Sequence, residues 1–193
     1  AYCRSLEKFG IETTNIFVED AAGIEPAIRD NTRILCYESP STQMMLLLDI
    51  ETIVALAKQR GVLTMTDNTW ATPLYQKPLT HGVDIAVHSC TKFIGGHSDT
   101  VGGVAVMSRE LMDKVFAFGH QYQGACLGPF EAWLLIRGLL TLPGRLAYSR
   151  TATEAVVEVL RRHPRVRTVN HPLCYEGQQK ALADKYLTGY TSL

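Results

Sequence analysis

The chain has 193 residues, of which 46% are hydrophobic and 20% are charged, a composition typical of an ordinary globular domain with one sizeable core. Its 19 basic residues balance its 19 acidic ones, so the net charge gives no reason to expect binding to nucleic acid or to an anionic membrane surface. No strictly apolar run is longer than residues 44–48, far too short to cross a bilayer, and no secretory leader pattern opens the sequence. We therefore expect a cytoplasmic protein without a membrane segment.

Five cysteines are spread along the chain, and no two of them form a CxxC pair. An odd number cannot close into a full set of disulfides, so we expect free thiols in a reducing compartment, most of them acting as small buried hydrophobes. The five are Cys3, Cys36, Cys90, Cys126 and Cys174.

The first half of the sequence predicts alternating strands and helices. Residues 49–60 (DIETIVALAKQR) repeat apolar side chains at helical spacing, with Asp49 as the N-cap and Gly61 as the stop. Short apolar runs bounded by turn residues lie on both sides of this helix, which predicts parallel strands joined by a right-handed crossover. The predicted strands are residues 33–38, 62–67, 84–89 and 101–107.

Helical periodicity dominates the second half. The predicted helices are residues 108–118, 129–142 and 149–163. Pro129 is tolerated in a first turn because its missing amide hydrogen would be unpaired there anyway. Residues 166–172 (VRTVNHP) predict a strand that enters a second, smaller unit, and we place the boundary between the two units within residues 145–162.

Both ends of the sequence have the pattern of an interrupted element. Residues 1–10 resemble the middle of a helix, and residues 189–193 have the pattern of a strand that is beginning. Complete domains usually end in polar, frayed residues. We therefore expect further chain on both sides.

Polar side chains follow three of the predicted strands. Asp67 ends one strand, Ser89, Thr91 and Lys92 follow another, and residues 38–42 (ESPST) follow a third. Ligands of an open parallel sheet bind outside the carboxyl ends of its strands, so these side chains are the first candidates for a site.

A lysine in this position can react as a nucleophile with an aldehyde and form a Schiff base. The hydroxyls of Ser89 and Thr91 suit a phosphate, and an ionised Asp67 could hold a pyridine nitrogen protonated. Taken singly, a lysine such as Lys92 is more often a solvated surface residue, Asp67 more often a helix or turn cap, and Ser89 and Thr91 more often turn formers. Their joint order favours a pyridoxal phosphate site.

Two histidines, His88 and His97, flank Lys92 in the sequence. No second pair of ligands at metal spacing accompanies them, so we expect no metal site and interpret both as core or hydrogen-bonding residues.

Residues 84–98 (DIAVHSCTKFIGGHS) resemble the cofactor-attachment motif of the cysteine and methionine metabolism family of pyridoxal-phosphate enzymes, which includes cystathionine lyases, cystathionine synthases and methionine lyase. A long motif with lysine, aspartate and hydroxyls in register is far more specific than a lone glycine loop. Other segments that resemble the family are residues 66–79, 137–146 and 168–173.

The resemblance implies an α/β fold of the type I aminotransferase-like class, a mostly parallel sheet flanked by helices. It implies that residues 1–150 form a large cofactor domain without its N-terminal part, and that residues 151–193 form a linking helix and the start of a small C-terminal domain. In the family's motif, Lys92 takes the place of the lysine that binds the pyridoxal aldehyde. Asp67 takes the place of the aspartate that binds the ring nitrogen. Ser89 and Thr91 take the places of the phosphate ligands.

The resemblance also implies parts that this sequence does not contain. The aromatic residue that stacks on the cofactor, the glycine-containing phosphate loop, and a tyrosine and an arginine from a neighbouring subunit would precede Ala1. The arginine that binds the substrate carboxylate would follow Leu193. Family members form tetramers with shared sites, so we expect a homo-oligomer that acts on a small sulfur-containing amino acid.

One position favours a particular reaction within the family. Many γ-acting and synthase members have an asparagine after ESP or ETP, whose amide reaches the cofactor's phenolic oxygen, whereas this chain has Thr42 there. A hydroxyl at this place, together with Trp70 and residues 169–172 (VNHP), resembles the bacterial cystathionine β-lyase branch. We therefore expect β-elimination of cystathionine. The alternatives are cystathionine γ-synthase, cystathionine γ-lyase or methionine γ-lyase activity, and an inactive remnant of such an enzyme.

Overall fold

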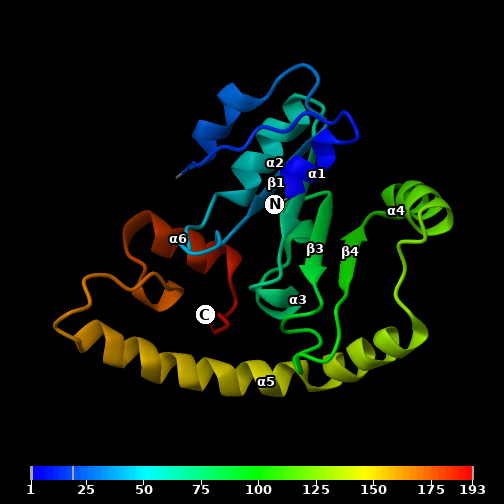
Figure 1. Ribbon diagram of the computed structural model, residues 1–193. Coiled ribbons are helices and arrows are strands. Elements are labelled where there is room, and N and C mark those ends of the chain that lie inside the picture. Colours follow the sequence, from blue (N-terminus) through cyan, green and yellow to red (C-terminus); the bar gives the residue numbers. More distant parts are fainter. Residues whose placement is uncertain (1, 19, 193) are drawn as a thin grey trace.

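The computed structural model describes residues 2–18 and 20–192, and its centre is a four-stranded sheet (Figure 1). The strand order is β1-β2-β3-β4; the first three strands are parallel, and β4 runs antiparallel to β3. The bounds are Ile34–Glu38 for β1, Leu63–Asp67 for β2, Ile85–Ser89 for β3 and Gly103–Met107 for β4. All four predicted strands are confirmed, and the fourth begins two residues later than its pattern indicated.

The crossover helix α2 (Ile50–Gln59) joins β1 to β2, as its sequence pattern predicts. It buries its apolar face, and Gly61 takes a left-handed conformation (φ 65°) directly after it, which only glycine adopts at little cost. Asp49 stands at the N-cap position, but its side chain makes no capping hydrogen bond to the helix. It bonds instead to Thr52 and to the C-terminal segment.

The remaining N-terminal elements are short. Helix α1 spans Tyr2–Glu7, so the expected N-terminal helix is present within the described residues. The 3-10 helix η1 (Ala21–Ala27) packs Ala21 and Ile24 against Leu48 and Ile53, which closes the outer side of α2. Between β2 and β3 the chain forms α3 (Thr72–Tyr75) and η2 (Pro78–His81).

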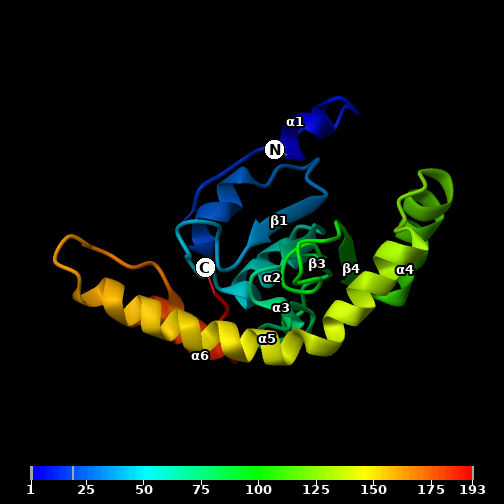
Figure 2. The same ribbon diagram turned by 60° about the horizontal axis from the view of Figure 1, so that its bottom comes forward.

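The longest element is helix α5 (Pro129–Arg162), which spans the width of the molecule as a bowed rod in both views (Figures 1 and 2). The sequence predicted two helices here, and this division was wrong, because Pro143 lies inside one continuous helix. A proline removes one backbone hydrogen bond and commonly bends a helix without ending it when packing holds both halves. Helix α5 faces the carboxyl ends of the parallel strands (Figure 1).

Helix α4 (Arg109–Val115) continues into a π-helical turn, η3 (Phe116–Tyr122), which lies beyond β4. Ser108 caps α4 by accepting a hydrogen bond from the Leu111 N–H. No described helix is both long enough and apolar enough to span a bilayer.

The strand predicted at residues 166–172 is wrong. After α5 the chain turns at residues 164–165, residues 166–170 have irregular backbone, and the chain then enters η4 (Pro172–Cys174). No described strand lies beside this segment, and an isolated extended segment has no ladder to satisfy its backbone groups. Residues 189–192 likewise form no strand, and Leu193 lies outside the described residues.

Helix α6 (Gly177–Tyr186) packs back onto the sheet domain. Leu182, Ala183 and Tyr186 share a buried cluster with Ile50 and Val54 of α2. The side chain of Gln179 pairs with both the N–H and the carbonyl of Leu47, at 2.8 and 2.9 Å. The C-terminal segment and α2 therefore share one core.

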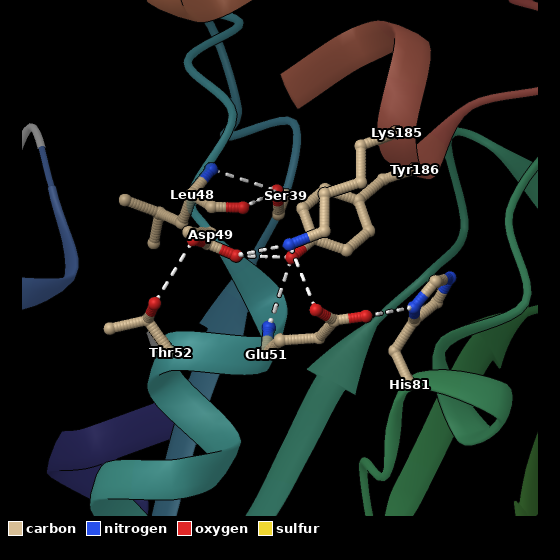
Figure 3. Close-up of polar contacts among 8 residues, drawn as sticks. All are labelled: Ser39, Leu48, Asp49, Glu51, Thr52, His81, Lys185 and Tyr186. Carbon is tan, nitrogen blue, oxygen red and sulfur yellow. Dashed lines mark hydrogen bonds and ion pairs between the residues drawn. The ribbon is translucent and has the colours of Figure 1, made fainter. Parts of the chain in front are cut away.

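A group of charged and polar side chains fixes the end of α6 to the start of α2 (Figure 3). The Tyr186 hydroxyl donates to Asp49 and accepts from the Glu51 N–H, and the Lys185 ammonium contacts both carboxylates at 3.3 and 2.9 Å. Glu51 also contacts His81 Nδ1 at 3.0 Å.

These contacts change the acidity of both carboxyl groups. Burial of Asp49 opposes ionisation, but hydrogen bonds from Tyr186 and Thr52 and the nearby Lys185 ammonium lower its pKa on balance. Hydrogen bonds from Lys185 and His81 lower the pKa of Glu51. Because both values are lowered in the folded state, this attachment stabilises the fold above about pH 4 and loses its contribution as the pH falls further.

Candidate active site

A cavity of about 1520 Å³ lies where the carboxyl ends of the parallel strands face α5. It is larger than the roughly 300–1,000 Å³ of typical small-molecule pockets, so a cofactor and a substrate could occupy it together. All five site residues predicted from the sequence line it. They are Thr42, Asp67, Ser89, Thr91 and Lys92.

Lys92 lies in a tight turn directly after β3. Its N–H donates to the Ser89 carbonyl at 3.2 Å, and its own carbonyl accepts from the Gly96 N–H at 2.8 Å. None of the described residues forms a hydrogen bond or an ion pair with its ammonium group, and the side chain is exposed to the cavity. The turn thus fixes the backbone while the amine stays available to a ligand.

Asp67 ends β2, in register with Glu38 of β1 and Val87 of β3. Its Oδ1 accepts a hydrogen bond from the Thr69 N–H at 2.9 Å, and the residue is half-buried in the cavity wall. One carboxylate oxygen is therefore engaged by backbone, while Oδ2 forms no hydrogen bond to a described residue.

The two predicted phosphate ligands differ in their surroundings. The Ser89 N–H donates to Thr69 Oγ1 at 2.7 Å, and its hydroxyl has no partner among residues 2–18 and 20–192. The Thr91 hydroxyl donates to the Gly102 carbonyl at 3.3 Å and accepts from the Gly102 N–H at 3.1 Å. To donate to a phosphate, Thr91 must release the carbonyl, and a bond of that length is weak.

Thr42 lies on the loop after β1 and contacts Glu38. Its N–H donates to Glu38 Oε2 at 3.0 Å, and its hydroxyl donates to the same oxygen. Both residues line the cavity. The Glu38 carboxylate thus already accepts the hydrogen of the Thr42 hydroxyl.

Arg145 of α5 is a cavity residue that sequence reasoning missed. Its guanidinium donates to the carbonyls of Phe93 at 2.7 Å, Ile94 at 3.2 Å and Gly138 at 2.8 Å. Burial lowers the pKa of this arginine. A Cβ on Gly96, whose φ is 75°, would overlap the guanidinium. Arg145 thus ties the turn that carries Lys92 to α5.

Gly138 allows α5 to approach the same turn, and this contact can be tested with two alanine substitutions. A Cβ at Gly138 would lie closer than 3.0 Å to the backbone oxygens of Ile94 and Gly95, whereas a Cβ at Gly144 meets nothing within 4 Å. We expect Gly138→Ala to destabilise the protein by about 1–3 kcal/mol through overpacking. Gly144→Ala should stabilise it by about 0.5–1 kcal/mol through helix propensity.

Urea unfolding of both variants measures the difference. Equal stability of the two would contradict the close contact between α5 and the Lys92 turn.

Trp70 forms a further part of the cavity wall, together with the C-terminal segment. Its Nε1–H donates to the Ser192 carbonyl at 3.1 Å, and its own carbonyl accepts from the Thr191 hydroxyl at 2.8 Å. The buried ring of His171 meets Trp70 edge to face. Burial lowers the pKa of His171, and its Nδ1 accepts from the Leu173 N–H, so Nε2 carries the hydrogen and donates to the Thr191 carbonyl.

The two histidines near Lys92 have structural surroundings. His88 is buried in β3, and burial lowers its pKa. His97 Nδ1 lies 2.7 Å from the Gly95 carbonyl. Among the described residues no group of three or more His, Cys, Asp and Glu side chains could hold a metal ion. Cys90, Cys126 and Cys174 form no disulfide. Cys90 is buried against Ile94 and Leu135, as expected of a small hydrophobe. Cys36 and Cys126 are exposed and Cys174 is half-buried, so the expectation that most of the cysteines are buried was wrong for the described residues.

Residues 2–193 match the family described as Cys/Met metabolism PLP-dependent enzymes. The chain belongs to this family. The Cys/Met metabolism enzymes depend on pyridoxal phosphate, so the cofactor expected from the sequence is confirmed at the level of the family. The resemblance seen in the lysine motif is likewise confirmed.

Several curated members of the Cys/Met metabolism family are similar to the chain. Cystathionine γ-lyase of Bacillus subtilis (strain 168) is 38% identical over 167 residues, which cover 86% of this chain and 44% of the relative. Cystathionine β-lyase MetC of the same strain is 40% identical over 167 residues, 86% of this chain and 43% of the relative. The chain spans about half the length of the curated relatives it matches.

A solved structure of the same family confirms the fold. The crystal structure of cystathionine γ-lyase from Lactobacillus plantarum, complexed with L-serine, superimposes with a TM-score of 0.91 at 32% identity. The superimposed part covers 98% of this chain and 50% of the chain in the Lactobacillus plantarum structure. The chain therefore has the type I fold, with a mostly parallel sheet and flanking helices.

Proposed function

We propose that this chain is the cofactor-bearing part of a carbon–sulfur lyase that converts cystathionine to homocysteine, pyruvate and ammonia by β-elimination. This proposal rests on one observation, the meeting of an amine, a carboxylate and hydroxyls in a single cavity at the sheet edge. The family match adds the cofactor, and the β-lyase relative from Bacillus subtilis adds an example of the reaction.

The residues present fit pyridoxal phosphate. The cofactor has an aldehyde, a basic ring nitrogen and a phosphate, and the cavity offers the Lys92 amine, the Asp67 carboxylate and the Ser89 hydroxyl. We propose that Thr91 adds a second phosphate donor by turning from Gly102, and that Thr42 faces the phenolic oxygen. When bound, the cofactor supplies an electron sink for the negative charge that develops at the substrate α-carbon.

In this proposal Lys92 has two roles. Its amine would hold the cofactor through the aldehyde, and Lys92 Nζ would remove the proton from the α-carbon of the substrate. A positioned base of this kind typically contributes roughly 10²- to 10⁴-fold to a rate. The electron pair left by the proton expels homocysteine thiolate from the β-carbon, and water converts the three-carbon remainder to pyruvate and ammonia.

Asp67 keeps the ring nitrogen protonated, and the Thr69 N–H fixes the direction of its carboxylate. Arg145 and the turn at residues 92–96 keep Lys92 at the end of β3. We propose that Trp70, with the segment around Ser192, bounds the substrate side of the cavity and thereby favours cleavage at the β-carbon. Thr42, whose hydroxyl donates to Glu38, supports the proposal because a hydroxyl at this position resembles the bacterial β-lyase branch.

The reaction is tested by incubating the purified full-length protein, which includes the chain on both sides of residues 1–193, with pyridoxal phosphate and cystathionine. We expect pyruvate and homocysteine as products, measured by chromatography of the keto acids and thiols. Formation of 2-oxobutyrate and cysteine would instead assign γ-elimination and overturn the β-lyase proposal. The Lys92→Ala variant gives the background of the assay.

We propose three further features. Residues 1–150 belong to the large cofactor domain and residues 151–193 begin the small one. The protein works in the cytoplasm as a homotetramer. Exposed apolar side chains along α5 are available for a contact between subunits: Phe130, Trp133, Ile136 and Leu140.

A further inference from the structure

Thr69 lies between the two strand ends that bear Asp67 and Ser89. Its backbone N–H donates to Asp67 Oδ1 at 2.9 Å, and its side-chain Oγ1 accepts from the Ser89 N–H at 2.7 Å. The residue is half-buried and lines the cavity. One threonine therefore contacts a carboxylate at the end of β2 and the backbone at the end of β3.

The contact with Ser89 lies beyond the regular ladder of the sheet. The pairing of β2 with β3 ends at Asp67 and Val87, and the last backbone hydrogen bond between them runs from the Asn68 N–H to the Val87 carbonyl at 2.8 Å. The next N–H that β3 directs to this side belongs to Ser89, where β2 has already turned away. A part-buried N–H needs an acceptor, and the Thr69 hydroxyl supplies it.

We propose that Thr69 is a positioning residue for cofactor binding, which sets the distance between the Asp67 carboxylate and the Ser89 hydroxyl. This inference rests on the proposed function, in which these two groups hold opposite ends of pyridoxal phosphate, the ring nitrogen and the phosphate. A rigid ligand held at both ends binds best when the protein presents both groups at the matching separation before binding. Thr69 provides that separation through two short bonds from a single residue.

Two substitutions separate the hydroxyl from the shape of the side chain. Thr69→Val keeps the branched shape and the backbone N–H but removes the acceptor for Ser89, whereas Thr69→Ser keeps the oxygen. Thr80→Val is the matched control, because among the described residues the exposed Thr80 hydroxyl donates only to the Lys77 carbonyl, outside the cavity. If Thr69→Val fails to fold, Thr69→Ala removes the same oxygen without adding an apolar methyl group.

The experiment measures pyridoxal-phosphate affinity by equilibrium titration and the hydrogen-exchange rate of the Ser89 amide in the cofactor-free protein. We expect Thr69→Val to weaken cofactor binding by roughly 3- to 10-fold, the usual effect of one lost hydrogen bond, and to accelerate Ser89 exchange. Thr69→Ser and Thr80→Val should match the wild type in both measurements.

Unchanged affinity in Thr69→Val would overturn the inference, whether or not Ser89 exchange changes. Failure of the wild type itself to bind the cofactor would overturn the proposed function and this inference together. The wild-type titration therefore tells the two failures apart.

Discussion

Replacing Lys92 with alanine is expected to abolish the visible absorbance of the lysine-bound cofactor and to lower turnover of cystathionine by at least about 10²- to 10⁴-fold, the contribution of a positioned base. The substitution removes the only amine that the cavity lining offers among the described residues. It leaves the turn intact, because the hydrogen bonds to Ser89 and from Gly96 use the backbone of residue 92. The loss would therefore report chemistry and not folding.

The measurement is a titration of the variant with pyridoxal phosphate, followed by absorbance and by a pyruvate assay. Lys114→Ala is the control, because Lys114 is an exposed lysine of α4 that pairs with Glu110, and such surface pairs contribute little. Wild-type absorbance and turnover in the Lys92 variant would reject this lysine as the attachment site.

Asp67→Asn is expected to give the second-largest effect, a fall in turnover of roughly 10- to 150-fold, which corresponds to the loss of one hydrogen bond to a charged group. Asparagine keeps the shape of the side chain and an oxygen that can accept from the Thr69 N–H. It removes the negative charge that keeps the ring nitrogen protonated, so the electron sink is weakened while the cofactor can still attach to Lys92.

Steady-state kinetics and the absorbance of the bound cofactor test this prediction. The control is Asp113→Asn on α4, which removes an exposed carboxylate paired with Arg109. A variant that binds the cofactor and turns over at the wild-type rate would show that Asp67 does not partner the ring.

The parallel sheet could be predicted because several local signals agreed. Helix α2 has an apolar face and a left-handed glycine at its end, and short apolar runs flank it as β1 and β2. That residues 129–162 form one helix, α5, could not be predicted, because Pro143 is a helix breaker by local preference. The structure buries Leu142 and Leu146 on either side of this proline, and no local pattern encodes that packing. The strand predicted at residues 166–172 failed because a few apolar residues do not make a strand without a neighbour to pair with.

The convergence of Lys92, Asp67 and Thr42 followed from topology alone, since parallel strands end at one edge of a sheet. The residues that contact them could not be predicted from topology. Arg145 reaches Phe93 across 52 positions of sequence, and Trp70 reaches Ser192 across 122. Contacts of that kind depend on how α5 and the C-terminal segment pack, which no local pattern encodes.

The most direct test of the central claim is to incubate the protein with pyridoxal phosphate, reduce the mixture with borohydride, and map the modified lysine by peptide mass spectrometry. Borohydride converts a Schiff base into a stable secondary amine, so it marks the attached lysine permanently. We expect the phosphopyridoxyl group on the peptide that contains Lys92. Modification of a different lysine, or of none, would contradict the account.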